Sequence, residues 1–97
     1  MRADYDSQAD ALDIQLFRFD LYEHQEEVDD DYCRVGFAKG RPADVELLSP
    51  AEHLDLLEVA AERFGLDATA LTAAARAALS APDRVVELEV GKRQLVA

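Results

Sequence analysis

Tryptophan is absent from this chain, cysteine occurs once, and aromatic residues make up only 7% of its 97 residues. The single cysteine, Cys33, excludes an intramolecular disulfide and any metal site built from several thiolates, and it points to a reducing compartment. With so few aromatic side chains, the core has to be filled with Leu, Val and Ala. We therefore expect a thin core, and self-association as a homodimer to cover a leftover apolar face.

Basic residues and long apolar runs are also scarce. Lysine and arginine number 10 against 21 Asp and Glu, which gives a formal net charge of −11. Because this charge repels phosphate backbones and anionic lipids, we expect a basic protein partner, and neither nucleic acid nor a membrane; the alternative is that the acidity serves solubility alone. No apolar run approaches the roughly 20 residues that span a bilayer, and Met1–Asp6 lacks the apolar segment of a secretory leader. The sequence predicts a cytoplasmic protein.

The composition is that of a globular protein, with 49% hydrophobic and 32% charged residues. A chain of this length can bury one core and is too short for two. No internal repeat, linker or low-complexity tract divides it. We therefore expect a single domain over residues 1–97.

The first half of the chain has the period-two alternation of β-strands. This pattern predicts a hairpin from strands over residues 2–6 and 11–19, joined by a turn at Asp6–Asp10. Two further strands are predicted over 32–38 and 43–48, with Lys39–Pro42 as their turn. The acidic stretch between Tyr22 and Asp31 is expected to be a solvated edge or loop. Residues 1–49 thus form a predicted β meander.

The second half begins with a helix start signal. Ser49 is a predicted N-cap, with Pro50 at the first helical position and Glu52 completing a capping box. The helix is expected to run to about Phe64 and to end at Gly65 in a left-handed cap.

A second helix, from about 68 to 79, is expected to follow with Asp67 as its N-cap. Residues 84–90 alternate and predict a C-terminal strand, which either rejoins the sheet, pairs with 94–96 or pairs with another subunit. The predicted fold class is α+β: an antiparallel sheet of four to six strands with a helical hairpin packed on one face.

Residues 5–14, Tyr-Asp-Ser-Gln-Ala-Asp-Ala-Leu-Asp-Ile, open with an aromatic-Asp turn, continue with Ala9-Asp10-Ala11-Leu12 and lead into an alternating strand. Together with the closing strand 43–49, this pattern resembles domain-of-unknown-function family 2283 over residues 1–49. Gln8 and Asp13 depart from it, because Glu and an aromatic residue are common there. The resemblance implies a compact β-rich core and no established activity. Some members look like antitoxin partners of small basic toxins, which implies a similar role here by analogy.

Two clusters could bind a cation. Asp6, Asp10 and Asp13 carry oxygen ligands at loop spacing, but they lack the glycine and closing glutamate of a calcium loop, so turn capping is the preferred interpretation. His24 lies among carboxylates that can bind transition metals, and no spacing connects it with His53. We therefore expect no metal site and no cofactor.

No arrangement in the sequence is typical of catalysis. Cys33 alternates with Val35 and Phe37, which predicts a small buried hydrophobe rather than a nucleophile. The serines lie in turns or caps, and the four glycines form no phosphate cradle. We therefore predict a protein that is not an enzyme and has no catalytic residues.

The expected function is a non-enzymatic protein-interaction module that self-associates or binds a basic protein in an antitoxin-like way. Its predicted partner-binding residues are acidic: Glu23, Glu26, Glu27, Asp29, Asp30 and Asp31. The alternative is a DNA-binding module related to transcription, because residues 60–71 resemble a helix-turn-helix with glycine in the turn. The second helix would then offer only Thr69, Thr72 and Arg76 to the bases.

Overall fold

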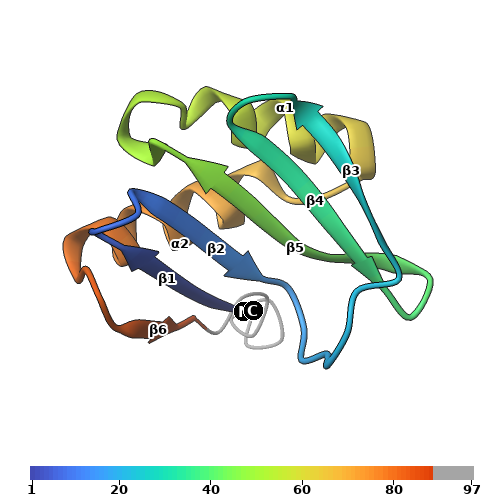
Figure 1. Cartoon of the computed structure of the whole chain (residues 1–97), viewed down its shortest axis with the longest axis horizontal. Helices are drawn as coiled ribbons and strands as arrows, with labels where there is room; N and C mark the ends of the chain where they lie inside the picture. The colour runs from blue at the N-terminus through green and yellow to red at the C-terminus, as the bar shows by residue number, and fades with distance from the viewer. Residues whose placement is uncertain (89–97) are drawn as a thin grey trace, which may run out of the picture.

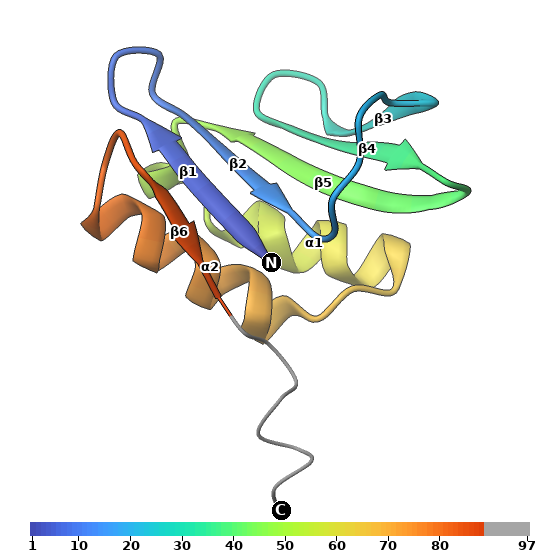
Figure 2. The ribbon, with the colours of Figure 1, turned by 90° about the horizontal axis from the view of Figure 1, so that it is seen from below.

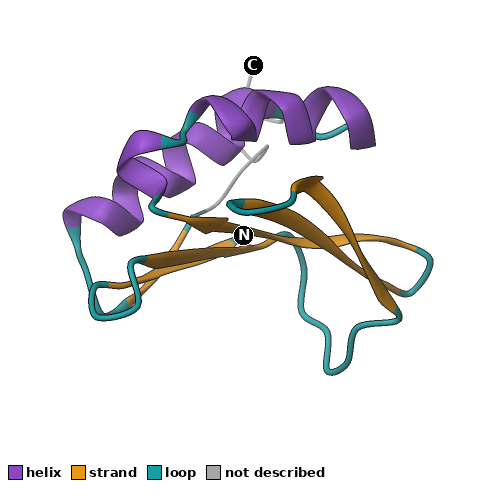
Figure 3. Ribbon diagram, turned by 45° about the horizontal axis from the view of Figure 1, so that its top comes forward, coloured by secondary structure: helices purple, strands orange, loops and turns teal. Residues whose placement is uncertain are grey.

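The computed structural model of the chain describes residues 1–88. All neighbouring strands in its six-stranded sheet are antiparallel, in the order β3-β4-β5-β2-β1-β6 (Figure 1). The strands are β1 (Arg2–Asp6), β2 (Ala11–Gln15), β3 (His24–Asp29), β4 (Cys33–Ala38), β5 (Arg41–Leu48) and β6 (Val85–Glu87). The helices are the short 3₁₀ helix η1 (Pro50–Glu52), α1 (Asp55–Phe64) and α2 (Ala68–Ser80). Both α-helices cover one face of the sheet, so the predicted α+β fold is confirmed (Figure 3).

The core lies between the sheet and this helix layer. α1 contacts β3, β4 and β5, whereas α2 contacts β1, β2 and β6 (Figure 2). Alternate strand residues point into the core, and helix residues three and four apart complete it. The larger side chains with no exposed surface are Leu12, Ile14, Val35, Val45, Leu47 and Leu57. Alanines fill most of the space between the helices and the sheet: Ala60, Ala61, Ala74, Ala75 and Ala78.

The predicted hairpin of β1 and β2 is confirmed, but β2 is shorter than expected. It ends at Gln15 rather than near Phe19. The apolar alternation changes parity at Leu16, so Phe17 and Phe19 could not continue the strand with their side chains in the core. Residues 16–23 instead form a loop, which leaves the sheet on the side away from the helices (Figure 3).

The turn between β4 and β5 is also shorter than predicted. It is formed by Lys39 and Gly40, which have φ angles of 56° and 75°. Two positive φ angles are typical of tight hairpin turns. Pro42 lies within β5, where the register shifts between Gly36 and Phe37. A bulge accommodates proline because it leaves room for a residue without an N–H donor.

The predicted start of the first helix is wrong. Only η1 follows Ser49, and α1 begins at Asp55. Ser49 has a φ of 47° and its side chain caps nothing. Its N–H donates to the carbonyl of Asp10 at 2.9 Å, so the contact with the β1–β2 turn sets a backbone conformation that differs from an N-cap.

The other predicted helix ends are confirmed. Gly65 ends α1 with a φ of 70°, and the Asp67 side chain accepts a hydrogen bond from the Ala70 N–H at 3.1 Å at the start of α2. Neither helix in residues 1–88 has both the length and the apolar character needed to cross a bilayer.

The C-terminal strand rejoins its own sheet, because β6 pairs with β1 from Arg2 opposite Glu87 to Asp4 opposite Val85. The structure describes this strand as Val85–Glu87, shorter than the predicted 84–90. Residues 89–97, including the alternative partner strand 94–96, lie outside the described residues.

Candidate functional site

The six acidic residues predicted to bind a partner lie along one edge of the sheet. Glu26, Glu27 and Asp29 lie within β3, Glu23 directly precedes it, and Asp30 and Asp31 lie in the turn to β4. β3 pairs only with β4 within the described residues, so its other side carries no strand. His24, Gln25, Glu26 and Glu27 are all exposed. The predicted edge is thus present, and it is a strand rather than a loop.

Three of these acids have local structural contacts. Glu23 accepts from the Gly40 N–H at 3.0 Å, and Glu27 lies 3.7 Å from Nε of Arg34. Asp29 Oδ1 accepts from the N–H groups of Asp31 and Tyr32, which closes the β3–β4 turn. These three side chains therefore stabilise the structure of the edge and also contribute to its negative charge.

The remaining three, Glu26, Asp30 and Asp31, are exposed, and Glu26 contacts only the exposed His24 on its own strand. Glu26 lies 3.1 Å from Nε2 of His24, whose ring stacks on Phe37 at a centroid distance of 4.5 Å. Asp30 and Asp31 form no ion pair within residues 1–88. They are the acids of this edge that are most available to a partner.

The C-terminal end of β3 is partly protected against pairing with a further strand. The β3–β4 register shifts between Glu27 and Asp29, and the Glu27 carbonyl accepts a hydrogen bond from Arg63 of α1 at 2.8 Å. A bulge and a capping side chain both reduce pairing with a further strand. The backbone is therefore most accessible between Glu23 and Glu26.

A second cluster of carboxyl groups lies on the open face of the sheet. Asp13 of β2 is opposite Asp4 of β1 and Glu46 of β5, and Asp44 lies two residues before Glu46. Asp44 is only 1% exposed. Its Oδ2 accepts from the Tyr22 hydroxyl at 2.5 Å, and its Oδ1 accepts from the Gly36 N–H at 3.2 Å. Oδ1 of Asp13 is buried and accepts a hydrogen bond from no N–H group or hydroxyl among residues 1–88.

Burial and this crowding change the acidity of the cluster. Burial is the largest of the effects that raise the pKa of Asp13 from 3.8 to about 9, followed by its hydrogen bond with Asp44. The charges of Asp44, Asp4 and Glu46 act in the same direction. Burial and the bond to Asp44 also raise the pKa of Tyr22. At neutral pH Asp13 therefore keeps its proton, as expected of a buried carboxyl group that lies close to others.

The sequence prediction missed this cluster because Asp13 and Asp44 alternate with buried aliphatic residues and so resemble ordinary solvent-facing strand positions. One signal was available. Aspartate is depleted in strands, so an aspartate on each of two central strands is unusual. That observation could have identified the positions, but not the loop that covers Asp44.

The predicted turn role of the early aspartates fits the structure. Asp6 Oδ1 accepts from the N–H groups of Gln8 and Ala9, and Asp10 accepts from the Tyr5 hydroxyl at 2.6 Å. Asp13 is part of the open-face cluster instead. No group of three His, Cys, Asp or Glu side chains in residues 1–88 has a geometry that could hold a metal ion.

The histidines and the cysteine lie in separate surroundings. His53 stacks on Tyr32 at a centroid distance of 3.9 Å and its Nδ1 lies 2.9 Å from the Ser49 carbonyl, whereas His24 stacks on Phe37 of β4. Cys33 is 3% exposed, as predicted for a small core residue. Burial, together with the charges of Asp29 and Glu27, raises the pKa of its thiol to about 12. It is a thiol at neutral pH and a poor nucleophile.

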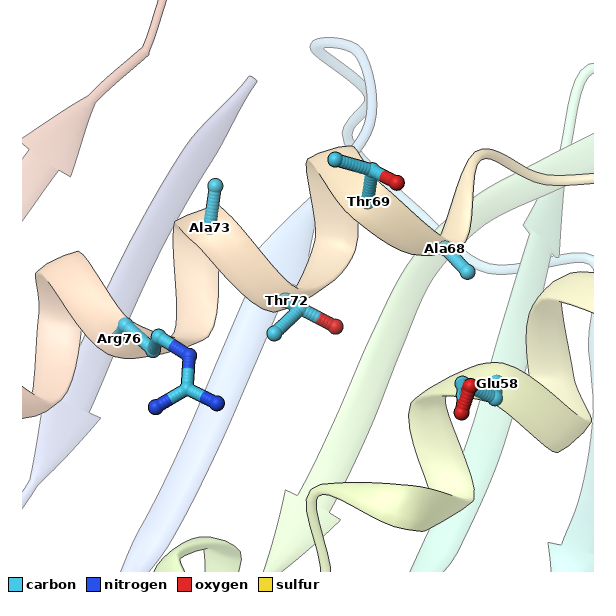
Figure 4. Close-up of a pocket in the computed structure, with 6 residues that line it drawn as sticks. All are labelled: Glu58, Ala68, Thr69, Thr72, Ala73 and Arg76. Atoms are coloured by element: carbon cyan, nitrogen blue, oxygen red, sulfur yellow. The ribbon is translucent and has the colours of Figure 1, made fainter.

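The predicted packing of both helices on the sheet is confirmed, which leaves only the outer face of α2 for DNA. A hollow of about 390 Å³ lies along this face, lined by Thr69, Thr72, Ala73 and Arg76 of α2 and by Glu58 of α1 (Figure 4). Arg76 is the only charged residue of α2. A face with one cation beside a carboxylate lacks the positive charge typical of phosphate contacts.

Comparisons of the chain with models of protein families, with curated protein sequences and with solved structures find no match. The resemblance of residues 1–49 to domain-of-unknown-function family 2283 therefore stays a prediction.

Proposed function

We propose that this chain is a non-enzymatic protein-interaction module that binds a basic, extended segment of another protein at the acidic edge strand β3. The observation that carries the proposal is the exposure of four consecutive β3 residues, His24–Glu27, on an edge with no further strand in residues 1–88. An exposed edge supplies backbone donors and acceptors for an added strand. Carboxylates on and beside the strand would select the partner's side chains.

The same charges explain why the partner should be basic. Edge strands tend to pair with one another, and charged side chains are a common protection against this. Two copies of this edge would bring Glu26 and Glu27 of each copy close together, which is unfavourable. A strand rich in lysine or arginine removes that repulsion, so the edge discriminates by charge. Such a role suits the predicted antitoxin-like binding of a small basic protein.

The test uses a labelled peptide of about ten residues that alternates lysine and valine, with binding followed by fluorescence anisotropy. We expect the combined substitutions Glu26→Gln, Asp30→Asn and Asp31→Asn to weaken binding about tenfold and to reduce its salt dependence. These acids are chosen because Glu26 contacts only the exposed His24, whereas the contacts of Glu23, Glu27 and Asp29 hold the backbone turns or neighbouring strands and would complicate the result.

A matched control changes the same number of charges on the exposed face of α1, through Asp55→Asn, Glu58→Gln and Glu62→Gln. This variant should bind the peptide as the unmodified protein does, apart from a small uniform loss from its lower net charge. Equal weakening in both variants would show non-specific attraction and reject the edge as the site. Binding of duplex DNA at low salt, sensitive to Arg76→Ala, would instead support the helix-turn-helix alternative.

Self-association stays a prediction. The charges on β3 argue against pairing between two copies at that edge. Sedimentation of the β3 variant, compared with the α1 variant, would separate a dimer formed at the edge from one formed by the helix layer.

A further inference from the structure

The loop of residues 16–23 is attached to the open face of the sheet through Tyr22. The Tyr22 hydroxyl donates to the buried carboxylate of Asp44, and its ring lies over Gly36. A side chain at Gly36 would overlap with Cε1 of Tyr22 and Oδ1 of Asp44, so glycine provides the space for both groups. Phe19 packs against the same ring at a centroid distance of 5.1 Å.

Tyr22 is also the residue that leads into the acidic edge. The next residue, Glu23, donates its N–H to the Phe37 carbonyl at 2.7 Å and starts the pairing of β3 with β4. At the other end of the loop, the Leu16 N–H donates to the Ala43 carbonyl at 2.7 Å. The hydrogen bond between Tyr22 and Asp44 therefore holds the end of the loop that leads directly into Glu23 and β3.

Asp44 can remain buried only while its surroundings tolerate its charge. The groups around the Asp13–Asp44 pair are mostly acidic: Asp4 from β1 and Glu46 from β5. The nearby arginines are already paired, Arg34 of β4 with Glu46 and with Glu27 of β3, and Arg2 of β1 with Glu87 of β6. A second negative charge on the pair would thus have no cation to balance it and would need water.

We propose that protonated Asp13, next to the buried Asp44, acts as a latch that keeps the loop of residues 16–23 closed on the sheet. When Asp13 loses this proton, the added negative charge next to Asp44 requires hydration, and Tyr22 moves away to admit water to Asp44. Opening of the loop then frees the start of β3. The raised pKa of Asp13 agrees with this order of events, because the closed state keeps the proton.

The consequence for partner binding rests on the function proposed above, whereas the latch itself is tested without a partner. Hydrogen exchange of the Glu23 amide is measured between about pH 7 and pH 10 and is expressed as a protection factor, which removes the intrinsic effect of pH. We expect protection to fall at least about tenfold over this range, while the amides of α2 keep theirs.

Asp13→Asn is the decisive variant, because its amide is neutral at every pH and can still donate to Asp44. It should keep Glu23 protected across the range. Tyr22→Phe, which retains the ring but loses the hydroxyl, should lower the protection of Glu23 already at about pH 7. Unchanged protection in the unmodified protein, an equal loss of protection in Asp13→Asn, or a loss shared by α2 would each overturn the proposal.

Discussion

Asp13 is the single residue whose protonation should most affect stability. Its folded-state pKa of about 9 lies above its ordinary value of 3.8, so the native protein holds this proton more tightly than the unfolded chain. The resulting stabilisation is complete below about pH 3.8 and is lost as the pH rises through about 9. Asp13→Asn should therefore have about the stability of the unmodified protein in acid and exceed it by about 1–3 kcal/mol in the free energy of unfolding near pH 9.

Urea unfolding at several pH values measures this difference. Glu62→Gln is the control, since it removes an exposed carboxylate from α1, on the opposite side of the sheet from Asp13. Its effect should stay within about 1 kcal/mol and vary little with pH. A constant difference between Asp13→Asn and the unmodified protein over the whole range would contradict the assignment of the proton to Asp13.

At the scale of single residues, the sequence predicts a role correctly where that role depends on the local sequence pattern. The alternation of Cys33 with Val35 predicts its place in the core, and the helical pattern directly after Asp67 predicts its place as an N-cap. The role of Asp44 could not be predicted in this way. It depends on Tyr22, which is 22 positions away in the chain and reaches Asp44 only because β2 ends early.

At the scale of helices and strands, the two predicted helix N-caps test whether the local sequence or a tertiary contact decides if a side chain caps a helix. Asp67 caps α2 in the structure, whereas Ser49 has its backbone held by Asp10 and caps nothing. We expect Asp67→Ala to lower the free energy of unfolding by about 1 kcal/mol. Ser49→Ala should change it by less than about 0.5 kcal/mol. Thermal unfolding of both variants gives the comparison, and equal losses would mean that the Ser49 hydroxyl caps the helix after all.

Among the strands, too, some form where the local sequence pattern predicts them and others depend on pairing with residues distant in the sequence. Alternation identified β1, β2, β4 and β5 because each has one face in the core. β3 has little apolar pattern, and only its pairing with β4 makes it a strand. The predicted meander over residues 1–49 is wrong in its strand order for a related reason, because β2 does not neighbour β3 or β4. β2 pairs with β5 across the intervening β3 and β4, and nothing in the local pattern of either strand specifies that partner.

At the scale of the whole molecule, the main feature is the excess of negative over positive charge. The chain carries a net charge of −11, and the described residues form a compact body with a radius of gyration of 12.7 Å. Folding brings these charges closer together, so their repulsion lowers stability most at low ionic strength. The cross-strand ion pairs of Arg2 and Arg34 oppose this trend only weakly, because their side chains are substantially exposed.

Salt should therefore stabilise this protein. Raising sodium chloride from about 0.02 M to about 0.5 M shortens the screening length well below the size of the domain, and we expect the melting temperature to rise by several degrees. The α1 variant Asp55→Asn, Glu58→Gln and Glu62→Gln has three fewer negative charges and should show a smaller rise. If salt lowered the melting temperature of both proteins, attractive pairs would outweigh the net repulsion. The acidic edge would then be balanced within the chain, and the main reason to expect a basic partner would be lost.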